Sequence, residues 1–418
     1  MFFSSPPWVS IVISSLLISL IGFSVRPIIA FTVCAATLFL TGTLNETELF
    51  SGYTNTALIT LMLLLTCSLA IEKTIFIKYI ANRLFTGSYH LSLSKLLLFT
   101  FISSSITNNT AIVSILKTCI TQNKSLIPSK YLLPLSYASI IGGTLTLVGT
   151  STTLVVSGLV EDHKLNPLGF FSTTPVSIFI VASCAIIIFV TAGKLLPENT
   201  VDKSIATTEL SSENNSKDYL NNRKSAFVLI SFIATLLLSA LSIVPLVKGL
   251  MALLAIYFFS NILTLVEIRK RAPLELFFVV GSAITIAAAI FKSGLSNILV
   301  DLILIIIQDK SVFAAFIAIY FITLFLTEMI TNTAAAALVF PISISIAEHY
   351  GANHSPFIMA IVFGASACFL SPFGYQTNLM VYSAGKYNLL NYIKFGLPVS
   401  LTYSATAIMV IPIIYPFY

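Results

Sequence analysis

The chain has 418 residues, of which 57% are hydrophobic and only 9% are charged, and its mean hydropathy is +0.97. In soluble domains about one quarter of the residues are charged, so this composition excludes a protein whose main solvent is water. The net charge of +6 does not indicate a nucleic-acid partner, because the basic residues are spread over short loops instead of forming one stripe.

Long apolar runs recur along the whole chain, and most approach the roughly 20 residues that a membrane-spanning helix needs. They must be helices, because the alternating pattern of an outer-membrane barrel is absent. In chain order these runs are Trp8–Ser24, Ile28–Thr43, Ala57–Ile71, Val176–Ala192, Ala226–Leu241, Leu246–Leu263, Leu274–Phe291 and Ile393–Tyr415. The sequence therefore predicts an all-α integral membrane protein.

One stretch interrupts the apolar pattern near the middle of the chain. The residues from Leu196 to Lys224 are rich in Ser, Asn, Glu and Lys and poor in large apolar side chains. This composition predicts a solvated cytoplasmic linker over residues 196–225. The linker divides the chain into two halves, residues 1–195 and 226–418.

The two halves share two motifs in the same order. An Asn-Thr-Ala sequence begins at Asn109 in the first half and at Asn332 in the second, each inside an apolar segment. A glycine-containing polar interruption follows at nearly the same spacing in both halves, at Gly149–Thr153 and Gly374–Asn378. Two motifs in matching order and spacing indicate an internal repeat.

The positions of Lys and Arg predict how the chain crosses the membrane. Each half threads as three spanning helices, a re-entrant hairpin (91–122 or 311–349), a broken helix (128–160 or 353–384) and a last helix. This places 18 of the 22 Lys and Arg in the cytoplasm, leaving Lys164, Lys248, Lys292 and Lys310 outside. Five crossings per half invert the second half, which gives about ten spanning helices in two inverted repeats, as in many secondary transporters.

Polar residues inside an apolar segment need partners in protein, water or a ligand. Where helices break at mid-membrane, their free N–H groups attract anions and their free carbonyl groups attract cations. Asn and Thr side chains add donors and acceptors, so one site can hold an anion and sodium without a fixed buried charge. The alternative is that these residues only form hydrogen bonds across helix interfaces, and Gly142 and Gly143 only close helix contacts.

Glu328 is the acidic residue that comes just before the second Asn-Thr-Ala motif. A carboxylate inside a membrane segment is by default a functional candidate. The alternative is a structural one, in which Glu328 accepts hydrogen bonds from neighbouring backbone without touching a solute.

The stretch Ala365–Met380 carries a family pattern. Its fixed positions are Ser366, Phe369, Pro372, Gly374 and Asn378. This spacing resembles that of the divalent anion/sodium symporters, and the Gly-Tyr-Gln-Thr-Asn sequence, together with Gly143–Ser151, is similar to their sulfate-type permeases. The resemblance covers nearly the whole chain.

The resemblance implies an elevator-type carrier, usually a dimer, in which a transport part slides along a fixed scaffold. It implies that the anion contacts both hairpin tips, through Asn108, Asn109, Thr110, Thr331, Asn332, Thr333 and Thr377. It places sodium between each tip and its partner loop, with ligands from Asn109, Gly149, Ser151, Thr152, Asn332, Gly374 and Asn378.

Three features depart from the family pattern. Phe373 stands where the family usually has a smaller aliphatic residue, and Thr153 stands where the first broken loop commonly ends in Asn. Because Thr153 replaces that Asn, the first sodium site departs from the family pattern. The central region is also far too short for the soluble regulatory domains of many sulfate-type members.

We therefore predict a secondary active transporter, not an enzyme, that couples sodium to a divalent anion such as sulfate or a small dicarboxylate. The expected setting is a homodimer in the lipid of a bacterial cytoplasmic (inner) membrane, with a small anionic solute and no nucleic acid as partner. No cofactor or metal other than sodium is expected, because the cysteines and histidines lack ligand spacing. An uncoupled anion channel and a proton-coupled carrier of another solute remain alternatives.

Overall fold

The structure is a computed structural model that describes residues 5–23, 25–75, 79, 83–123, 125–198, 220–308 and 311–418. Most of the linker predicted over 196–225, together with Lys78 and Lys310, lies outside the described residues.

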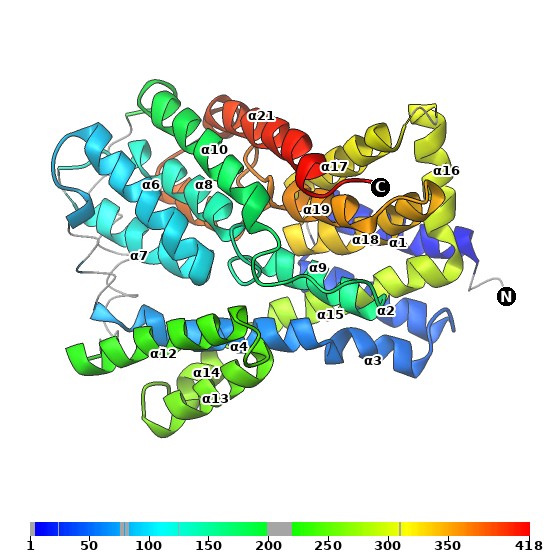
Figure 1. The fold of residues 1–418 in the computed structure, drawn as a ribbon, viewed down its shortest axis with the longest axis horizontal. Helices are drawn as coiled ribbons and strands as arrows, with labels where there is room; N and C mark the ends of the chain where they lie inside the picture. The colour runs from blue at the N-terminus through cyan, green and yellow to red at the C-terminus, as the bar shows by residue number, and fades with distance from the viewer. Residues whose placement is uncertain are drawn as a thin grey trace.

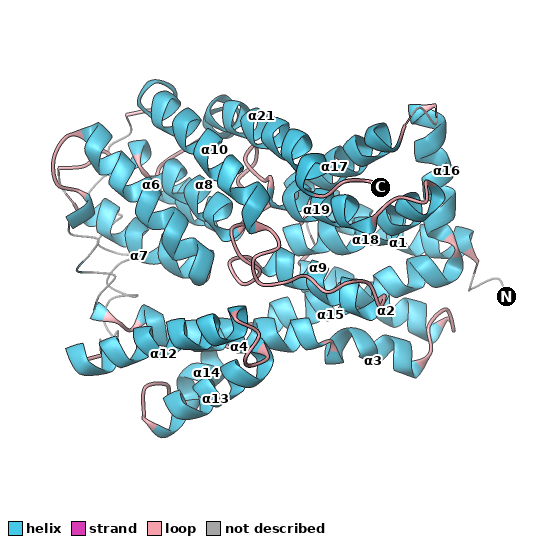
Figure 2. Cartoon of the chain, in the orientation of Figure 1, coloured by secondary structure: helices cyan, strands magenta, loops and turns pink. Residues whose placement is uncertain are grey.

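The described chain is helical throughout and contains no strand (Figure 2). In the first half the helices are α1 (Pro6–Ile21), α2 (Pro27–Leu40), α3 (Glu46–Thr54), α4 (Thr56–Glu72), α6 (Tyr89–Ile106), α7 (Asn109–Gln122), the 3₁₀ turn η2 (Pro128–Lys130), α8 (Leu132–Gly143), α9 (Ser151–Asp162) and α10 (Thr174–Leu195). In the second half they are α12 (Asn222–Ala240), α13 (Leu246–Phe259), α14 (Leu265–Arg271), α15 (Leu274–Ser293), α16 (Leu295–Ile307), α17 (Val312–Met329), α18 (Asn332–His349), α19 (His354–Ser366), α20 (Gln376–Ala384) and α21 (Leu389–Ile414). The predicted all-α class is confirmed.

Six stretches of helix in the described chain are long and apolar enough to cross a membrane. They are Glu46–Glu72, Thr174–Leu195, Asn222–Ala240, Leu274–Ser293, Val312–Met329 and Leu389–Ile414. Five shorter apolar helices accompany them. These lengths agree with an integral membrane protein, whereas the arrangement of its crossings as two inverted repeats stays a prediction.

The helices are distinguished in two groups, and in Figure 1 α3, α4 and α12 to α14 of the first lie below α6 to α8, α10 and α21 of the second. The first helix group comprises α1 to α4 and α12 to α15, and the second helix group comprises α6 to α10 and α17 to α21. Each group takes helices from both halves of the chain: α15 packs on α2 and α3 in the first group, and α10 packs along α21 in the second. The core is therefore built by pairing the halves and not by folding each half alone.

Among the described residues three ion pairs join the halves inside the first helix group, and two of them occupy matching positions. Lys292 Nζ lies 2.7 Å from Glu48 Oε2, and Lys73 Nζ lies 2.8 Å from Glu267 Oε1. Glu267 follows Glu48 by 219 residues, and Lys292 follows Lys73 by the same 219. Each glutamate also closes a capping box at the start of its short helix, α3 or α14. In each pair, a glutamate at the start of a short helix in one half contacts a lysine of the other half. This correspondence supports the predicted internal repeat.

The second helix group contains four breaks. α6 stops and α7 starts around Thr107, and α17 stops and α18 starts around Ile330. Longer irregular stretches, 144–150 and 367–375, separate α8 from α9 and α19 from α20. The breaks fall inside the ranges predicted as hairpins (91–122 and 311–349) and broken helices (128–160 and 353–384), and these assignments stay predictions. Entry of the hairpins from opposite membrane faces stays a prediction.

Asn55, between α3 and α4, makes a polar contact between the two helix groups. Its amide nitrogen donates to Gly158 O at 3.2 Å and to Asp162 Oδ2 at 2.9 Å, both in α9. Its Oδ1 accepts from the N–H of Ala57 and thereby caps α4. A Cβ atom added to Gly158 would lie 2.5 Å from Asn55 Oδ1, so this approach requires glycine.

A second close approach occurs where α21 meets the irregular stretch after α19. A Cβ atom added to Gly396 would overlap the carbonyl oxygen of Phe369 and lie 2.9 Å from the Tyr137 hydroxyl. That hydroxyl donates to the same carbonyl at 2.5 Å. The position therefore has room only for a hydrogen.

We expect Gly396→Ala to lower the free energy of unfolding by about 1–3 kcal/mol, because the new methyl group forces the backbone apart. The matched control is Gly193→Ala in α10, whose Cβ would make an ordinary 3.5 Å contact with Tyr89. Thermal loss of the helical circular-dichroism signal in detergent measures both variants. Equal melting temperatures for the two variants would contradict the close approach.

Candidate functional site

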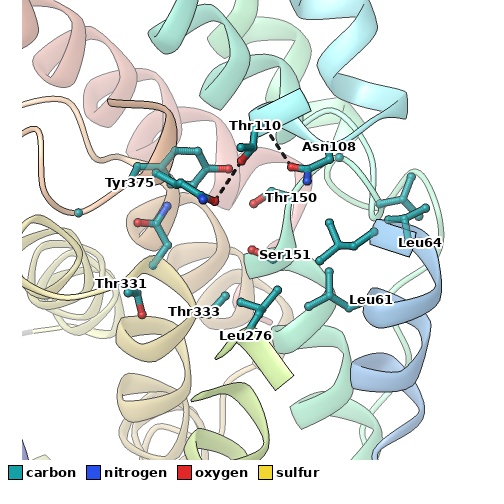
Figure 3. A pocket seen from close by; sticks show the side chains of 16 residues that line it. Leu61, Leu64, Asn108, Thr110, Thr150, Ser151, Leu276, Thr331, Thr333 and Tyr375 are labelled. Carbon is teal, nitrogen blue, oxygen red and sulfur yellow. Dashed lines mark hydrogen bonds between the residues drawn. The ribbon is translucent and has the colours of Figure 1, made fainter. Parts of the chain in front are cut away.

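A cavity of about 200 Å³ lies between the two helix groups, at the level of the four breaks (Figure 3). Its lining consists of Leu61, Leu64, Leu65, Asn108, Thr110, Val148, Gly149, Thr150, Ser151, Leu276, Thr331, Asn332, Thr333, Gly374, Tyr375 and Gln376. Pockets for drug-sized ligands span about 300–1,000 Å³. This cavity therefore suits a small solute.

The cavity has two chemically different walls. All of its polar residues come from the second helix group, whereas the first helix group contributes four leucines, from α4 and α15. Figure 3 shows Leu61, Leu64 and Leu276 facing Thr150, Ser151 and Thr331 across the space. Any polar solute is therefore held by the second helix group and only covered by the first.

Four helices begin at this cavity. The residues just before α7, α9, α18 and α20 are Asn108, Thr150, Thr331 and Tyr375, and all four line it. The first N–H groups of a helix have no partner within the helix, and they carry a partial positive charge. No side chain in the described lining is charged. The electrostatics of the cavity are thus set by helix starts and neutral donors.

At the first tip, between α6 and α7, the two asparagines serve different purposes. Asn108 Oδ1 accepts from the N–H of Thr110 at 3.1 Å and so caps α7. Asn109 is only 1% exposed, and its Nδ2 donates to the Tyr375 hydroxyl at 2.7 Å. The Thr110 hydroxyl donates to Gln376 Oε1 at 3.2 Å. Two side-chain bonds therefore connect this tip to the start of α20, in the other half of the chain.

At the second tip, between α17 and α18, Thr331, Asn332 and Thr333 all line the cavity. The Thr331 hydroxyl and the Asn332 Nδ2 are buried and have no hydrogen-bond partner among the described residues. Such groups cost free energy unless a ligand or water satisfies them. They are therefore the clearest candidates in this cavity for donating hydrogen bonds to a solute.

The carboxylate of Glu328 turns away from the cavity, toward the stretch between α19 and α20. Its Oε1 accepts from the N–H of Phe369 and of Leu370, each at 2.8 Å. Its Oε2 accepts from the Cys368 thiol at 3.6 Å. Of the two interpretations open from the sequence, the geometry favours the structural one: Glu328 positions the loop that leads to Gly374 and Tyr375.

The predicted contacts divide into two sets. Those that line the cavity are Asn108, Thr110, Gly149, Ser151, Thr331, Asn332, Thr333 and Gly374, and Asn109 adjoins it through Tyr375. Those not brought to the cavity are Thr152, Thr377 and Asn378. Their roles as substrate or sodium ligands stay predictions.

Thr377 and Asn378 are engaged elsewhere in the protein. Ser136 Oγ of α8 lies 2.9 Å from Thr377 Oγ1 and 2.7 Å from Asn378 Oδ1. Asn378 Nδ2 donates to the carbonyl oxygen of Cys368 at 2.9 Å and to that of Ser371 at 3.2 Å. Both side chains are fully buried and hold the start of α20 against α8.

Several lining residues were not predicted as contacts. Tyr375 and Gln376 lie within the predicted partner loop, and Thr150 lies in the matching loop of the first half, so the motif spacing already marked their positions. The four leucines had no such signal, because nothing distinguishes them from other apolar residues of their helices.

These features define a class of protein. Helices able to cross a membrane surround a polar cavity where other helices break, which is the architecture of a membrane transporter. The chain belongs to the citrate transporter family, whose model matches residues 8–354. The recognition of a divalent anion/sodium symporter from its motifs is thereby confirmed, and the protein is a transporter and not an enzyme.

Individual relatives agree with this class. The chain is 36% identical over 195 residues to an uncharacterized transporter of Synechocystis, across 45% of this chain and 31% of that protein. It is 35% identical over 133 residues to sodium/sulfate cotransporter 1 of Chlamydomonas reinhardtii, across 32% of this chain and 15% of that protein. An uncharacterized transporter of Haemophilus influenzae is 25% identical over 285 residues, across 65% of this chain and 59% of that protein. In each case the match spans less than two thirds of the relative.

We expect Glu328→Ala to destabilise the protein, because two backbone N–H groups lose a charged acceptor at a cost of roughly 1–3 kcal/mol each. Glu328→Gln keeps one acceptor oxygen and should lose less. Glu275→Ala, at an exposed glutamate of α15, is the control. Melting temperatures in detergent rank the variants, and a Glu328→Ala protein as stable as the control would refute the positioning role.

Proposed function

We propose that this protein is a sodium-coupled symporter of a divalent anion, either sulfate or a small dicarboxylate, in the cytoplasmic membrane. The observation that carries the proposal is the meeting of four helix starts at one cavity whose described lining has no charged side chain. The names of relatives as sodium/sulfate cotransporters support the same class of solute.

The helix starts favour a doubly charged anion. Each carries roughly half a positive charge, so four together amount to about two, as many as a divalent anion needs. The Asn332 amide and the Thr331 and Thr333 hydroxyls supply donors around it. The absence of Lys and Arg from the described lining means that the anion is released without breaking a strong ion pair.

Sodium would bind on the carbonyl side of the same breaks. α8 ends at Gly143, and a Cβ atom added there would lie 2.7 Å from Asn109 Nδ2, 3.0 Å from Gly149 O and 3.1 Å from Asn109 Oδ1. Carbonyl oxygens at the ends of broken helices are sodium ligands in other secondary transporters. A cation beside Asn109 would strengthen anion binding at the same tip, which couples the two solutes.

The division of the cavity walls supports an elevator movement. The second helix group holds every polar contact, and the first presents leucines. Within the cavity, the second group can therefore slide with its solute without exchanging hydrogen bonds with the leucine wall of the first, and the Asn55 bonds to α9 are the contacts that such a movement would have to break. The same leucine wall argues against a channel, which requires a continuous polar pore.

Uptake of radiolabelled sulfate and, separately, succinate into proteoliposomes tests this function. An inward sodium gradient should drive uptake of one of the two anions, whereas equal gradients of potassium or protons should not. Uptake that ignores every cation gradient would refute coupling, and uptake of neither anion would refute the solute class.

Asn109→Ala and Asn332→Ala are expected to reduce sodium-driven uptake at least about 100-fold, because each removes buried polar groups at a tip. Both variants should still insert and elute as folded protein on size-exclusion chromatography. Asn297→Ala, at an exposed asparagine of α16, is the matched control and should transport normally. Normal uptake by both tip variants would remove the tips from the site.

A further inference from the structure

We infer that the first helix group binds the headgroups of anionic phospholipids at the end where α4 finishes. This inference goes beyond the proposed function, because it concerns the bilayer around the protein and not the transported solute. Three observations carry it. Basic side chains without partners gather at this end, exposed apolar side chains lie one helical turn from two of them, and the matching helix of the other half has neither.

Two segments of the second half meet the end of α4. The N–H of Leu220, just before α12, donates to Lys73 O at 2.9 Å. On α14, Arg271 Nη1 lies 2.9 Å from Glu72 Oε2, and Glu267 Oε1 lies 2.8 Å from Lys73 Nζ. The start of α12 and the whole of the short helix α14 therefore lie beside the same end of α4.

Basic side chains outnumber acidic ones among the described residues at this end. Glu72 and Glu267 are paired, and Glu275 follows α14 by four residues. We call the region the basic end, and its six basic residues are Lys73, Arg223, Lys224, Arg269, Lys270 and Arg271. Six basic and three acidic side chains leave it with a net charge of +3.

Four of these basic side chains have no carboxylate partner within the described part of the chain. They are Arg223 and Lys224 at the start of α12 and Arg269 and Lys270 at the end of α14, and all four are exposed. Exposed cations of this kind attract an anionic membrane surface, each strengthening the attachment about fivefold.

Helix stability does not account for all of the charges. Arg269 and Lys270 lie in the last turn of α14, where the partial negative charge of the helix end favours cations. Arg223 and Lys224 lie in the first turn of α12, where the partial positive charge disfavours them and no acidic residue is present. An anionic partner from outside the chain offsets this cost.

Exposed apolar side chains accompany the charges in α14. Leu265 is 66% exposed and Val266 is 74% exposed. Residues four positions apart share one face of a helix, so Leu265 lies one turn before Arg269, and Val266 lies one turn before Lys270. A topology signal needs only the charges. A phospholipid, by contrast, offers an apolar chain next to an anionic headgroup, which matches both kinds of side chain.

The internal repeat does not require either feature. α3 is the helix of the first half that matches α14, because their capping-box glutamates are 219 residues apart. At this offset Leu265–Val266 corresponds to Glu46–Thr47, and Arg269–Arg271 corresponds to Phe50–Gly52. The matching helix thus has no apolar pair at its start and no basic residue at its end. The basic end is therefore a property of one copy of the repeat.

A bound headgroup at this place acts on the part of the protein that the proposed elevator movement keeps fixed. α14 and α13 lie at the outer edge of the first helix group (Figure 1). Lipid attached there holds the end of α4 at the bilayer surface while the second helix group moves.

The test uses the full-length protein in detergent, titrated with dioleoylphosphatidylglycerol or dioleoylphosphatidylcholine, and native mass spectrometry counts the bound lipids. Phosphatidylglycerol should bind at least about tenfold more tightly than phosphatidylcholine. Equal affinities would overturn the inference. Inorganic phosphate in large excess should displace no more phosphatidylglycerol than chloride of the same ionic strength. Displacement specific to phosphate would assign the site to a soluble anion and overturn the lipid as its ligand.

Charge variants locate the binding. Arg269→Gln combined with Lys270→Gln should weaken phosphatidylglycerol binding about tenfold and leave phosphatidylcholine binding unchanged. Lys164→Gln combined with Lys248→Gln is the matched control, because it removes the same charge from exposed lysines outside the basic end that have no carboxylate partner in the described chain. Equal losses in the two double variants would overturn the assignment to the basic end.

An apolar variant tests the acyl-chain contact. Leu265→Ser combined with Val266→Ser keeps every charge, and it should weaken phosphatidylglycerol binding at least about threefold, because apolar contact is lost. Unchanged affinity would leave a site for anions of any kind and overturn the match to a phospholipid. The lipid preference of the wild-type protein decides the question even where a variant fails to fold.

Discussion

A helix that begins inside a protein leaves several backbone N–H groups without partners, and this chain begins four helices around one small space. Each start needs something to accept its hydrogen bonds, and side-chain caps at Asn108 and Thr150 meet that need only in part. The rest of the second helix group is arranged around this requirement. The anion of the proposed function is a partner of the kind that helix starts bind.

Close backbone contact is what allows the breaks to face one another. Gly143 and Gly149 bring the end of α8 against the last turn of α6, and Gly396 brings α21 against the carbonyl of Phe369. Glu328 also fixes the backbone of this region. Its carboxylate accepts hydrogen bonds from two backbone N–H groups in the irregular stretch after α19, where no helical carbonyl accepts them. Shape in this region is therefore fixed largely by backbone contacts, while the Thr331 hydroxyl and the Asn332 Nδ2 have no partner among the described residues.

Motif spacing indicated all four breaks, because polar Asn and Thr residues inside an apolar segment need partners in protein, water or a ligand. The spacing could not predict which partners the side chains at those breaks bind. Asn109 and Asn332 stand in the same sequence context, yet one donates to Tyr375 and the other accepts from Thr327. Asn378 is held by Ser136, a residue 242 positions away. Partners so distant in sequence are set by packing, which no local pattern records.

The Asn55 contact has a consequence for how the two helix groups part. The Asn55 oxygen caps α4, and the Asn55 nitrogen donates to α9. Breaking the bonds to α9 therefore leaves the cap of α4 in place. The contact with α9 consists of two hydrogen bonds, each of which stabilises the folded protein by about 1 kcal/mol. Under the proposed elevator movement, these two bonds are the ones that break and form again between the helix groups. A larger residue at position 158 would push against Asn55 Oδ1 and weaken this contact, and under the proposed elevator movement it would favour the form in which α9 is released.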